Sequence, residues 1–148
     1  ASPVCTEYST AKTTGVRNLA HADALAQKTL DVIAYFQPRY WWIANPQTGI
    51  LKTRPFMRGL PYYDVDYCQY GLPYRKRTRL WTNASFEPKP MCDRRTCPFV
   101  ADGSHIKSAQ RGPDKNRSKV RKHDDCFEQS SLYKIPVDLC AEIAVASA

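Results

Sequence analysis

The residues best suited to covalent chemistry in this chain lie in a proline turn and in a short basic segment. Cys5 ends a Ser-Pro-Val-Cys turn, and residues 75–79 read RKRTR, with arginines at alternate positions. A cysteine thiolate is a strong nucleophile once positive surroundings lower its pKa. Alternate side chains of a strand share one face, where arginines bind carbonyl or phosphate oxygens. The sequence therefore offers a nucleophile with cationic partners. The alternatives are an inert buried thiol and a solvated strand face.

A second group of reactive side chains lies further along the chain. Cys92, Cys97 and His105 are close in sequence, and His123 and Cys126 follow. Thiolates and imidazoles of this kind bind structural zinc, which can hold a loop-rich region together. The Cys-x4-Cys spacing is looser than the usual Cys-x2-Cys, so thiols that only pack are the alternative.

The cysteine usage and the charge narrow the location and the partners. Six cysteines are spread over 148 residues without a visible secretory signal, so we expect free thiols or metal ligands rather than disulfides. This favours an intracellular protein of the nucleus or the cytoplasm. The net charge of +8 favours an acidic partner such as nucleic acid, and the charged loop at residues 111–122 is the best candidate for phosphate contacts. No stretch approaches the roughly 20 apolar residues of a membrane span, so no membrane partner is expected.

The periodicity predicts an α/β domain. Apolar residues recur at helical spacing over residues 18–36, and an aromatic run with strand character follows at 39–44. A strand end before this helix and a strand after it would form a crossover in a parallel sheet. The further predicted elements are strands at 65–69 and 78–82 and a helix at 135–146 that starts at Pro136.

Four motifs in order resemble the C5-cytosine DNA methyltransferases, particularly the short phage and viral versions. SPVC resembles their Ser-Pro-Pro-Cys nucleophile loop, and ANP at residues 44–46 resembles Glu-Asn-Val or Glu-Asn-Pro. RKRTR resembles their Gln-x-Arg-x-Arg strand, and YKIPVDLCAEI resembles their last helix. The resemblance covers most of the chain. It implies a C-terminal part of such an enzyme, without the N-terminal cofactor-binding half.

The resemblance also implies roles for individual residues. A thiolate adding to cytosine C6 makes C5 nucleophilic enough to accept a methyl group from S-adenosylmethionine, once the base has left the duplex. The implied site consists of Cys5, Arg77 and Arg79 for catalysis, Asn45 and Arg75 for substrate binding, and Ser2 and Pro3 for cofactor binding. The fold would be part of a Rossmann-like S-adenosylmethionine-dependent methyltransferase sheet. The predicted divisions are a catalytic-loop half at 1–83, a basic target-recognition-like insert at 84–131 and a C-terminal helix at 132–148 that packs back on the fold.

Several departures from the family pattern leave the activity open. Ala44 stands at the position of the family's glutamate, Val4 replaces a proline, and Arg75 replaces a glutamine. None of the six glycines forms a Gly-x-Gly loop, so we expect a second polypeptide to carry the N-terminal cofactor-binding half. The alternatives are a catalytically dead basic DNA-binding module or regulatory subunit, and a small zinc-stapled protein unrelated to methylation.

Overall fold

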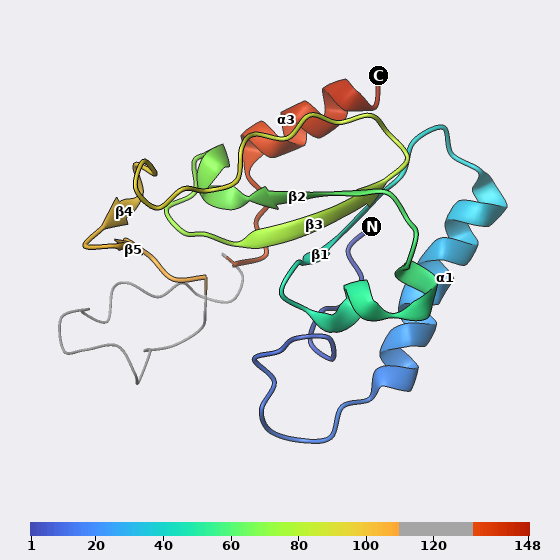
Figure 1. The fold of residues 1–148 in the computed structure, drawn as a ribbon. Coiled ribbons are helices and arrows are strands. Elements are labelled where there is room, and N and C mark those ends of the chain that lie inside the picture. Colours follow the sequence, from blue (N-terminus) through green and yellow to red (C-terminus); the bar gives the residue numbers. More distant parts are fainter. Residues whose placement is uncertain (110–131) are drawn as a thin grey trace. The chain divides into compact units, whose positions relative to one another are not determined.

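The computed structural model describes residues 1–109 and 132–148 as a mixed α/β chain (Figure 1). The elements in order are α1 (Leu19–Phe36), β1 (Trp42–Pro46), the 3-10 helices η1 (Ile50–Thr53) and η2 (Pro55–Met57), β2 (Tyr62–Asp66), the 3-10 helix η3 (Tyr67–Tyr70), β3 (Arg77–Thr82), β4 (Val100–Ala101), β5 (Ser104–His105) and α3 (Val137–Ala146). The chain forms two compact units. Unit 1 comprises Ala1–Val65, Arg77–Pro88 and Ala146–Ala148, and unit 2 comprises Asp66–Lys76 and Lys89–Val145.

Helix α1 confirms the helix predicted from the apolar spacing. The side chain of Asn18 caps its first turn by accepting the His21 N–H at 3.0 Å. The helix ends at Gln37, which adopts the left-handed conformation with a φ of 45° directly before a proline. Ala22 and Ala26 are buried on the inner face, as the sequence spacing requires.

The strand pairing of unit 1 differs from the predicted parallel sheet. The strand order is β1-β3-β2, and β1 runs antiparallel to β3 with Asn45 opposite Arg79 and Ala44 opposite Leu80. Two backbone bonds, from Tyr67 to Lys76 and from Thr82 to Pro61, match antiparallel β2 and β3. The prediction of a parallel sheet is therefore wrong for these strands, because β2 and β3 follow each other over a connection too short for a crossover.

The first residues of the chain run beside β1. The Ala1 nitrogen donates to the Trp42 carbonyl at 2.6 Å, and the Ala44 N–H donates to the Ala1 carbonyl at 2.9 Å. These two bonds straddle Ile43 in the pattern of a parallel ladder. Because α1 lies between the two paired segments in sequence, this short stretch has the parallel arrangement expected of a strand–helix–strand crossover. Figure 1 shows the N-terminus beside β1.

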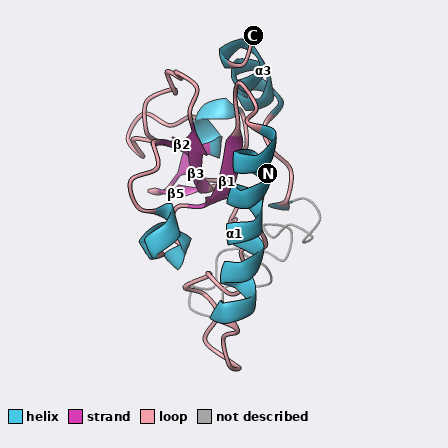
Figure 2. Ribbon diagram, turned by 90° about the vertical axis from the view of Figure 1, so that its right-hand side faces the viewer, coloured by secondary structure: helices cyan, strands magenta, loops and turns pink. Residues whose placement is uncertain are grey.

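The core of unit 1 joins α1 to one face of the β1–β3 pair. Alternation places Ile43 on the face that also holds its cross-strand partner Trp81, and both side chains are almost fully buried. Helix α1 lies against this face in Figure 2. The core cluster consists of Tyr8, Ala22, Ala26, Ile43, Leu51, Met57 and Trp81. The loop that follows Cys5 thus contributes Tyr8 to the same core as the helix and the sheet.

Unit 2 contains less regular structure. Tyr67–Tyr70 is a 3-10 helix that ends at Gly71 with a φ of 88°, so the strand predicted at 65–69 ends earlier, at Asp66. The two-residue strands β4 and β5 pair around Asp102 and Gly103, which both have positive φ, as this hairpin turn requires.

The remaining predictions for this part of the chain have mixed outcomes. Helix α3 confirms the predicted C-terminal helix, which begins just after Pro136. Within residues 84–109, β4 and β5 are the only strands. The charged loop at 111–122 lies outside the described residues. No helix in the described part of the chain combines the length and the apolar character needed to cross a bilayer.

Candidate active site and cysteine cluster

The loop that carries Cys5 is anchored to β1 on its N-terminal side. Cys5 is a free thiol of intermediate exposure. Before it, the Pro3 carbonyl accepts a hydrogen bond from the Asn45 side-chain amide at 2.9 Å, and the Ser2 hydroxyl donates to the Ala44 carbonyl at 3.3 Å. Ser2 and Pro3, the predicted cofactor-binding residues, therefore hold the loop against the end of β1.

The same loop is anchored on its C-terminal side through Tyr8. The Tyr8 N–H closes a turn on the Cys5 carbonyl at 3.1 Å, and the fully buried Tyr8 hydroxyl donates to the Asp23 carboxylate at 3.0 Å. Arg54 donates to both oxygens of Asp23. Burial, followed by the hydrogen bond to Asp23, raises the pKa of Tyr8 well above its usual range, so the hydroxyl remains a donor. Cys5 thus lies between Pro3, which is bonded to β1, and Tyr8, which is bonded to α1.

Gly49 allows the loop to approach the end of β1 closely. A Cβ atom at this position would lie 3.2 Å from the Pro46 carbonyl oxygen and 3.2 Å from the Tyr8 carbonyl oxygen. The next residue, Ile50, donates its N–H to the same Tyr8 carbonyl at 2.9 Å. The absence of a side chain at Gly49 therefore lets the loop take this path without a shift of either carbonyl.

The predicted catalytic arginines lie on one face at the start of β3. Thr78 is buried between Arg77 and Arg79, which are only half-buried. Arg79 forms two hydrogen bonds of 2.8 Å with Asp64, and its guanidinium lies 3.5 Å from the centre of the Tyr62 ring. The Asp64 carboxylate is the main reason why the pKa of Arg79 is raised. This side chain is consequently held in one position.

The Cys5 loop and the start of the arginine strand lie at the same end of the sheet. The N-terminal segment and β1 are parallel, so both finish at the same end of the sheet. Strand β3 begins at that end because it is antiparallel to β1. Asn45 faces Arg79 across the two strands and contacts Pro3 through its side chain. Arg75 precedes β3 and belongs to unit 2, so the strand alternation does not extend to it.

Residue 44 offers no carboxylate to this site. Ala44 lies opposite Leu80 in β1, and its backbone bonds to Ala1 and Ser2. A methyl group can neither donate a proton nor accept one. The general acid that the family pattern places at this position is therefore missing.

One hollow in unit 1 lacks a carboxylate that S-adenosylmethionine would need. An open hollow of about 410 Å³ lies beside β1, and no carboxylate lines it that could bind ribose hydroxyls. Its lining residues are Ala1, Leu25, Lys28, Thr29, Val32, Ile33, Trp41 and Trp42. The side chains around this hollow thus do not fit S-adenosylmethionine.

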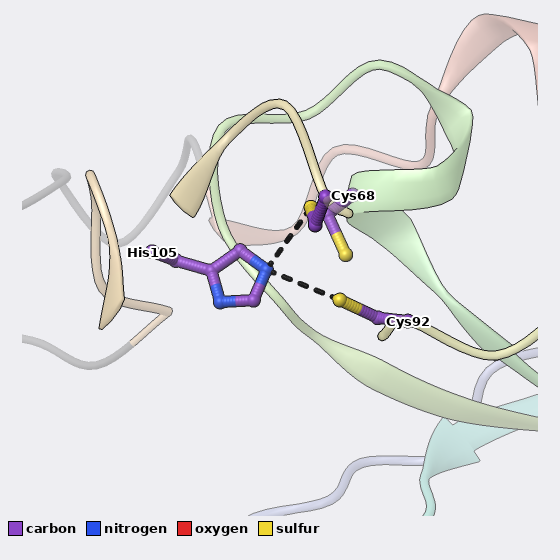
Figure 3. Close-up of side chains that lie close together, drawn as sticks. Cys68, Cys92 and His105 are labelled. Carbon is purple, nitrogen blue, oxygen red and sulfur yellow. Dashed lines mark hydrogen bonds between the residues drawn. The ribbon is translucent and has the colours of Figure 1, made fainter. Parts of the chain in front are cut away.

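A separate cluster of metal-ligating side chains lies within unit 2. The sulfur atoms of Cys68, Cys92 and Cys97 and a ring nitrogen of His105 all lie within 4.8 Å of one another. His105 Nε2 is 3.5 Å from Cys92 Sγ and 3.6 Å from Cys97 Sγ. Figure 3 shows the His105 ring directed toward the thiols. Burial is the main cause that raises the pKa of Cys68 and of Cys92.

Three members of this cluster were predicted from the sequence and one was not. Cys92, Cys97 and His105 belong to the predicted zinc-ligand group, whereas Cys68 lies far upstream in η3 with no spacing motif around it. The other two predicted ligands, His123 and Cys126, lie outside the described residues. The five described cysteines form no disulfide with one another.

The comparisons with known proteins point to one family. No family model and no solved structure matches the chain. The chain is similar to a protein of Frog virus 3 (isolate Goorha) described as a probable DNA (cytosine-5)-methyltransferase, with 42% identity over 76 residues. These residues make up 50% of this chain and 35% of the viral protein, so the match spans about a third of that relative. The similarity supports the C5-cytosine methyltransferase family and, with it, a methyltransferase role.

Proposed function

We propose that this chain carries the catalytic loop and part of the DNA-recognition region of a DNA (cytosine-5) methyltransferase. The observation that carries this proposal is the anchoring of the Cys5 loop, through Pro3 and Tyr8, at the sheet edge where the arginine strand begins. The similarity to the viral protein supports the same assignment. The proposed division of the chain is the predicted one, with a catalytic-loop half at 1–83, a target-recognition insert at 84–131 and a closing helix at 132–148.

In the proposed reaction, the Cys5 thiolate attacks C6 of a cytosine that has been flipped out of the duplex. The sulfur lone pair forms the new S–C6 bond, and the displaced π electrons of the C5–C6 double bond move into the ring as an enamine, which makes C5 nucleophilic. C5 then takes a methyl group from S-adenosylmethionine, which a second polypeptide with the cofactor-binding half would bind. Loss of the C5 proton to a base and departure of the thiolate restore the aromatic ring and the free enzyme.

The cationic residues have distinct proposed roles. Arg77 and Arg79 would contact the substrate base or a DNA phosphate at the end of the sheet where the Cys5 loop lies. Arg79 is fixed by Asp64 and Tyr62, so its guanidinium is presented with little loss of side-chain entropy. Arg75 stays a predicted substrate contact and belongs to unit 2. The buried amide of Asn45 would position the loop through Pro3.

Ala44 supports a second candidate, a DNA-binding module without methyltransferase activity. Loss of a general acid lowers a rate by about 10²–10⁴-fold, so the chain as it stands would be a slow enzyme at best. The net charge of +8 does not depend on residue 44 and supports binding to DNA phosphates. Such a module would bind duplex DNA with an affinity that falls steeply as salt increases, and it would form no covalent adduct.

Trapping on duplex DNA that contains 5-fluorocytosine distinguishes the two candidates. The chain is combined with the cofactor-binding N-terminal segment of a C5-methyltransferase and S-adenosylmethionine, in wild-type form and as Ala44→Glu. We expect Ala44→Glu to form a covalent DNA adduct that Cys5→Ser abolishes and that Cys140→Ser, a change at an exposed thiol, leaves intact. A complex that binds both cofactor and DNA but forms no adduct as Ala44→Glu would contradict the enzymatic proposal and favour the binding module.

A further inference from the structure

The cluster of Cys68, Cys92, Cys97 and His105 has the composition of a structural metal centre. Three sulfur atoms and one imidazole nitrogen lie within 4.8 Å of one another, and all four residues belong to unit 2. We propose that these four side chains bind one zinc ion as a closed Cys3His site. This proposal does not depend on methyltransferase activity, because none of the four residues belongs to the Cys5 site.

The two distances from His105 to cysteine sulfur atoms match tetrahedral zinc. With Zn–S bonds of about 2.3 Å and Zn–N bonds of about 2.0–2.1 Å, the tetrahedral angle places sulfur and nitrogen about 3.6 Å apart. The two sulfur-to-nitrogen distances from His105 are 3.5 Å to Cys92 and 3.6 Å to Cys97. A disulfide would use only two of the thiols at about 2.05 Å, and it would leave the third thiol and the imidazole unexplained.

The surroundings hold the ligands in place. Cys68, Cys97 and His105 are buried, and Cys92 is half-buried. The buried Asp66 carboxylate accepts the Cys92 N–H at 3.1 Å, and the Asp93 carbonyl accepts the Cys97 N–H at 2.9 Å. Such outer contacts orient the atoms that bind a metal.

A metal at this position would stabilise a region with little regular structure. Cys68 lies in η3, Cys92 and Cys97 flank a turn before β4, and His105 lies in the two-residue strand β5. One ion would therefore join three segments that backbone pairing alone holds weakly. Because four protein side chains fill the tetrahedral positions, the site is structural rather than catalytic.

Metal analysis of single variants tests the ligand assignment. The 148-residue chain is expressed with added zinc, purified without chelator, and its zinc is measured by mass spectrometry. We expect one zinc per chain in the wild type, a loss to background in Cys68→Ser, Cys92→Ser, Cys97→Ser and His105→Ala, and full retention in the controls Cys5→Ser and Cys140→Ser. A wild-type zinc content near zero would overturn the proposal. Retention in Cys68→Ser with loss in Cys126→Ser would overturn the assignment of Cys68.

A second measurement on the wild-type chain avoids any dependence on how well the variants fold. Zinc-loaded and chelator-treated chains are alkylated, and the modified cysteines are identified by peptide mass spectrometry. Zinc should protect Cys68, Cys92 and Cys97, whereas Cys5 and Cys140 should react in both samples. Cobalt added to the chelated chain should give the visible absorption of a tetrahedral thiolate complex. Equal alkylation in both samples, or a disulfide between two cluster cysteines, would contradict the proposal.

Discussion

The side-chain amide of Asn45 donates to the carbonyl oxygen of Pro3 at 2.9 Å and so joins the end of β1 to the loop that carries Cys5. Asn45 is 2% exposed, and its Oδ1 atom has no hydrogen-bond partner among residues 1–109 and 132–148. A buried amide that uses its donor and not its acceptor is a costly arrangement. Within the described part of the chain, the hydrogen bond from Asn45 to Pro3 is therefore the one interaction that offsets burial of this amide.

Replacing Asn45 should lower the free energy of unfolding and should also make Cys5 more accessible to reagents. Asn45→Ala removes one buried hydrogen bond and should lower the free energy of unfolding by about 1–3 kcal/mol in urea titrations. The rate at which Cys5 reacts with an alkylating reagent should increase, because Pro3 is released. Asn83→Ala, which removes side-chain bonds to Arg39 and Trp41 near the start of β1, should leave the Cys5 rate unchanged. An unchanged rate in Asn45→Ala would show that Pro3 does not hold the loop.

Gly49 should not tolerate a side chain. A Cβ atom would lie 3.2 Å from the carbonyl oxygens of Pro46 and Tyr8, closer than ordinary van der Waals contact. Gly49→Ala should therefore lower the free energy of unfolding by about 1–3 kcal/mol, as overpacked sites do. Gly59→Ala is not a neutral comparison because Gly59 has a φ of 81°, so Ser85→Ala at an exposed position serves as the control. A Gly49→Ala chain as stable as the wild type would argue against the close approach.

Arg79 should not be replaceable by lysine. Lysine keeps the charge but cannot form the pair of 2.8 Å bonds to Asp64 or stack in the same way on Tyr62. Arg79→Lys should lower the midpoint of urea unfolding, with a loss of about 1–2 kcal/mol. Arg58→Lys, at an exposed residue, should have no effect. Equal midpoints for Arg79→Lys and the wild type would mean that the paired geometry contributes little.

Tyr8 should make the fold sensitive to alkali. Its pKa is raised in the folded chain by burial and by Asp23, whereas an unfolded tyrosine ionises near pH 10. The unfolded chain therefore loses this proton first, and stability falls as the pH rises above about 10. Tyr8→Phe should lower the free energy of unfolding at neutral pH by about 1.5–3 kcal/mol, because a bond to a carboxylate is lost.

The pH dependence separates this effect from simple destabilisation. Tyr8→Phe should show a smaller loss of stability than the wild type between neutral pH and a pH above about 10. Tyr35→Phe, at a side chain that is 81% exposed, should leave both the neutral stability and the alkaline slope unchanged. An alkaline slope in Tyr8→Phe equal to that of the wild type would contradict the assignment to Tyr8.

Asp66 should tune the affinity of the proposed zinc site without binding the ion. Its carboxylate accepts the backbone N–H of Cys92, and loss of such an orienting contact lowers metal affinity by about 10–100-fold. Asp66→Asn should show this decrease in competition with a zinc-binding dye while still binding one ion. Glu87→Gln, at an exposed carboxylate, should keep the wild-type affinity. Loss of all zinc in Asp66→Asn would instead suggest that Asp66 is itself a ligand.

Patterns within short stretches of the sequence predicted α1, β1 and α3. The spacing of apolar residues predicted α1, and Pro136 with the apolar positions after it predicted α3. The aromatic run that leads into Asn45-Pro46 predicted β1. In each case the capping and periodicity rules act within a few residues of the chain.

The features that the sequence did not predict depend on contacts between distant residues. The antiparallel pairing of β1 with β3 joins residues more than thirty positions apart, and no local pattern specifies its direction. The aromatic residues of Tyr67–Tyr70 favour a strand, but this segment folds as a 3-10 helix before Gly71. For the same reason Cys68, which this turn brings to Cys92, was not predicted as a ligand.

The parallel segment at Ala1 gives β1 a neighbour on its second edge. Strand β3 occupies one side of β1, and the backbone of Ala1 takes the Trp42 carbonyl and the Ala44 N–H on the other. An open sheet edge is a template for pairing with a foreign strand and hence for aggregation. The N-terminal segment therefore also occupies backbone groups of β1 that would otherwise be open to pairing with a foreign strand.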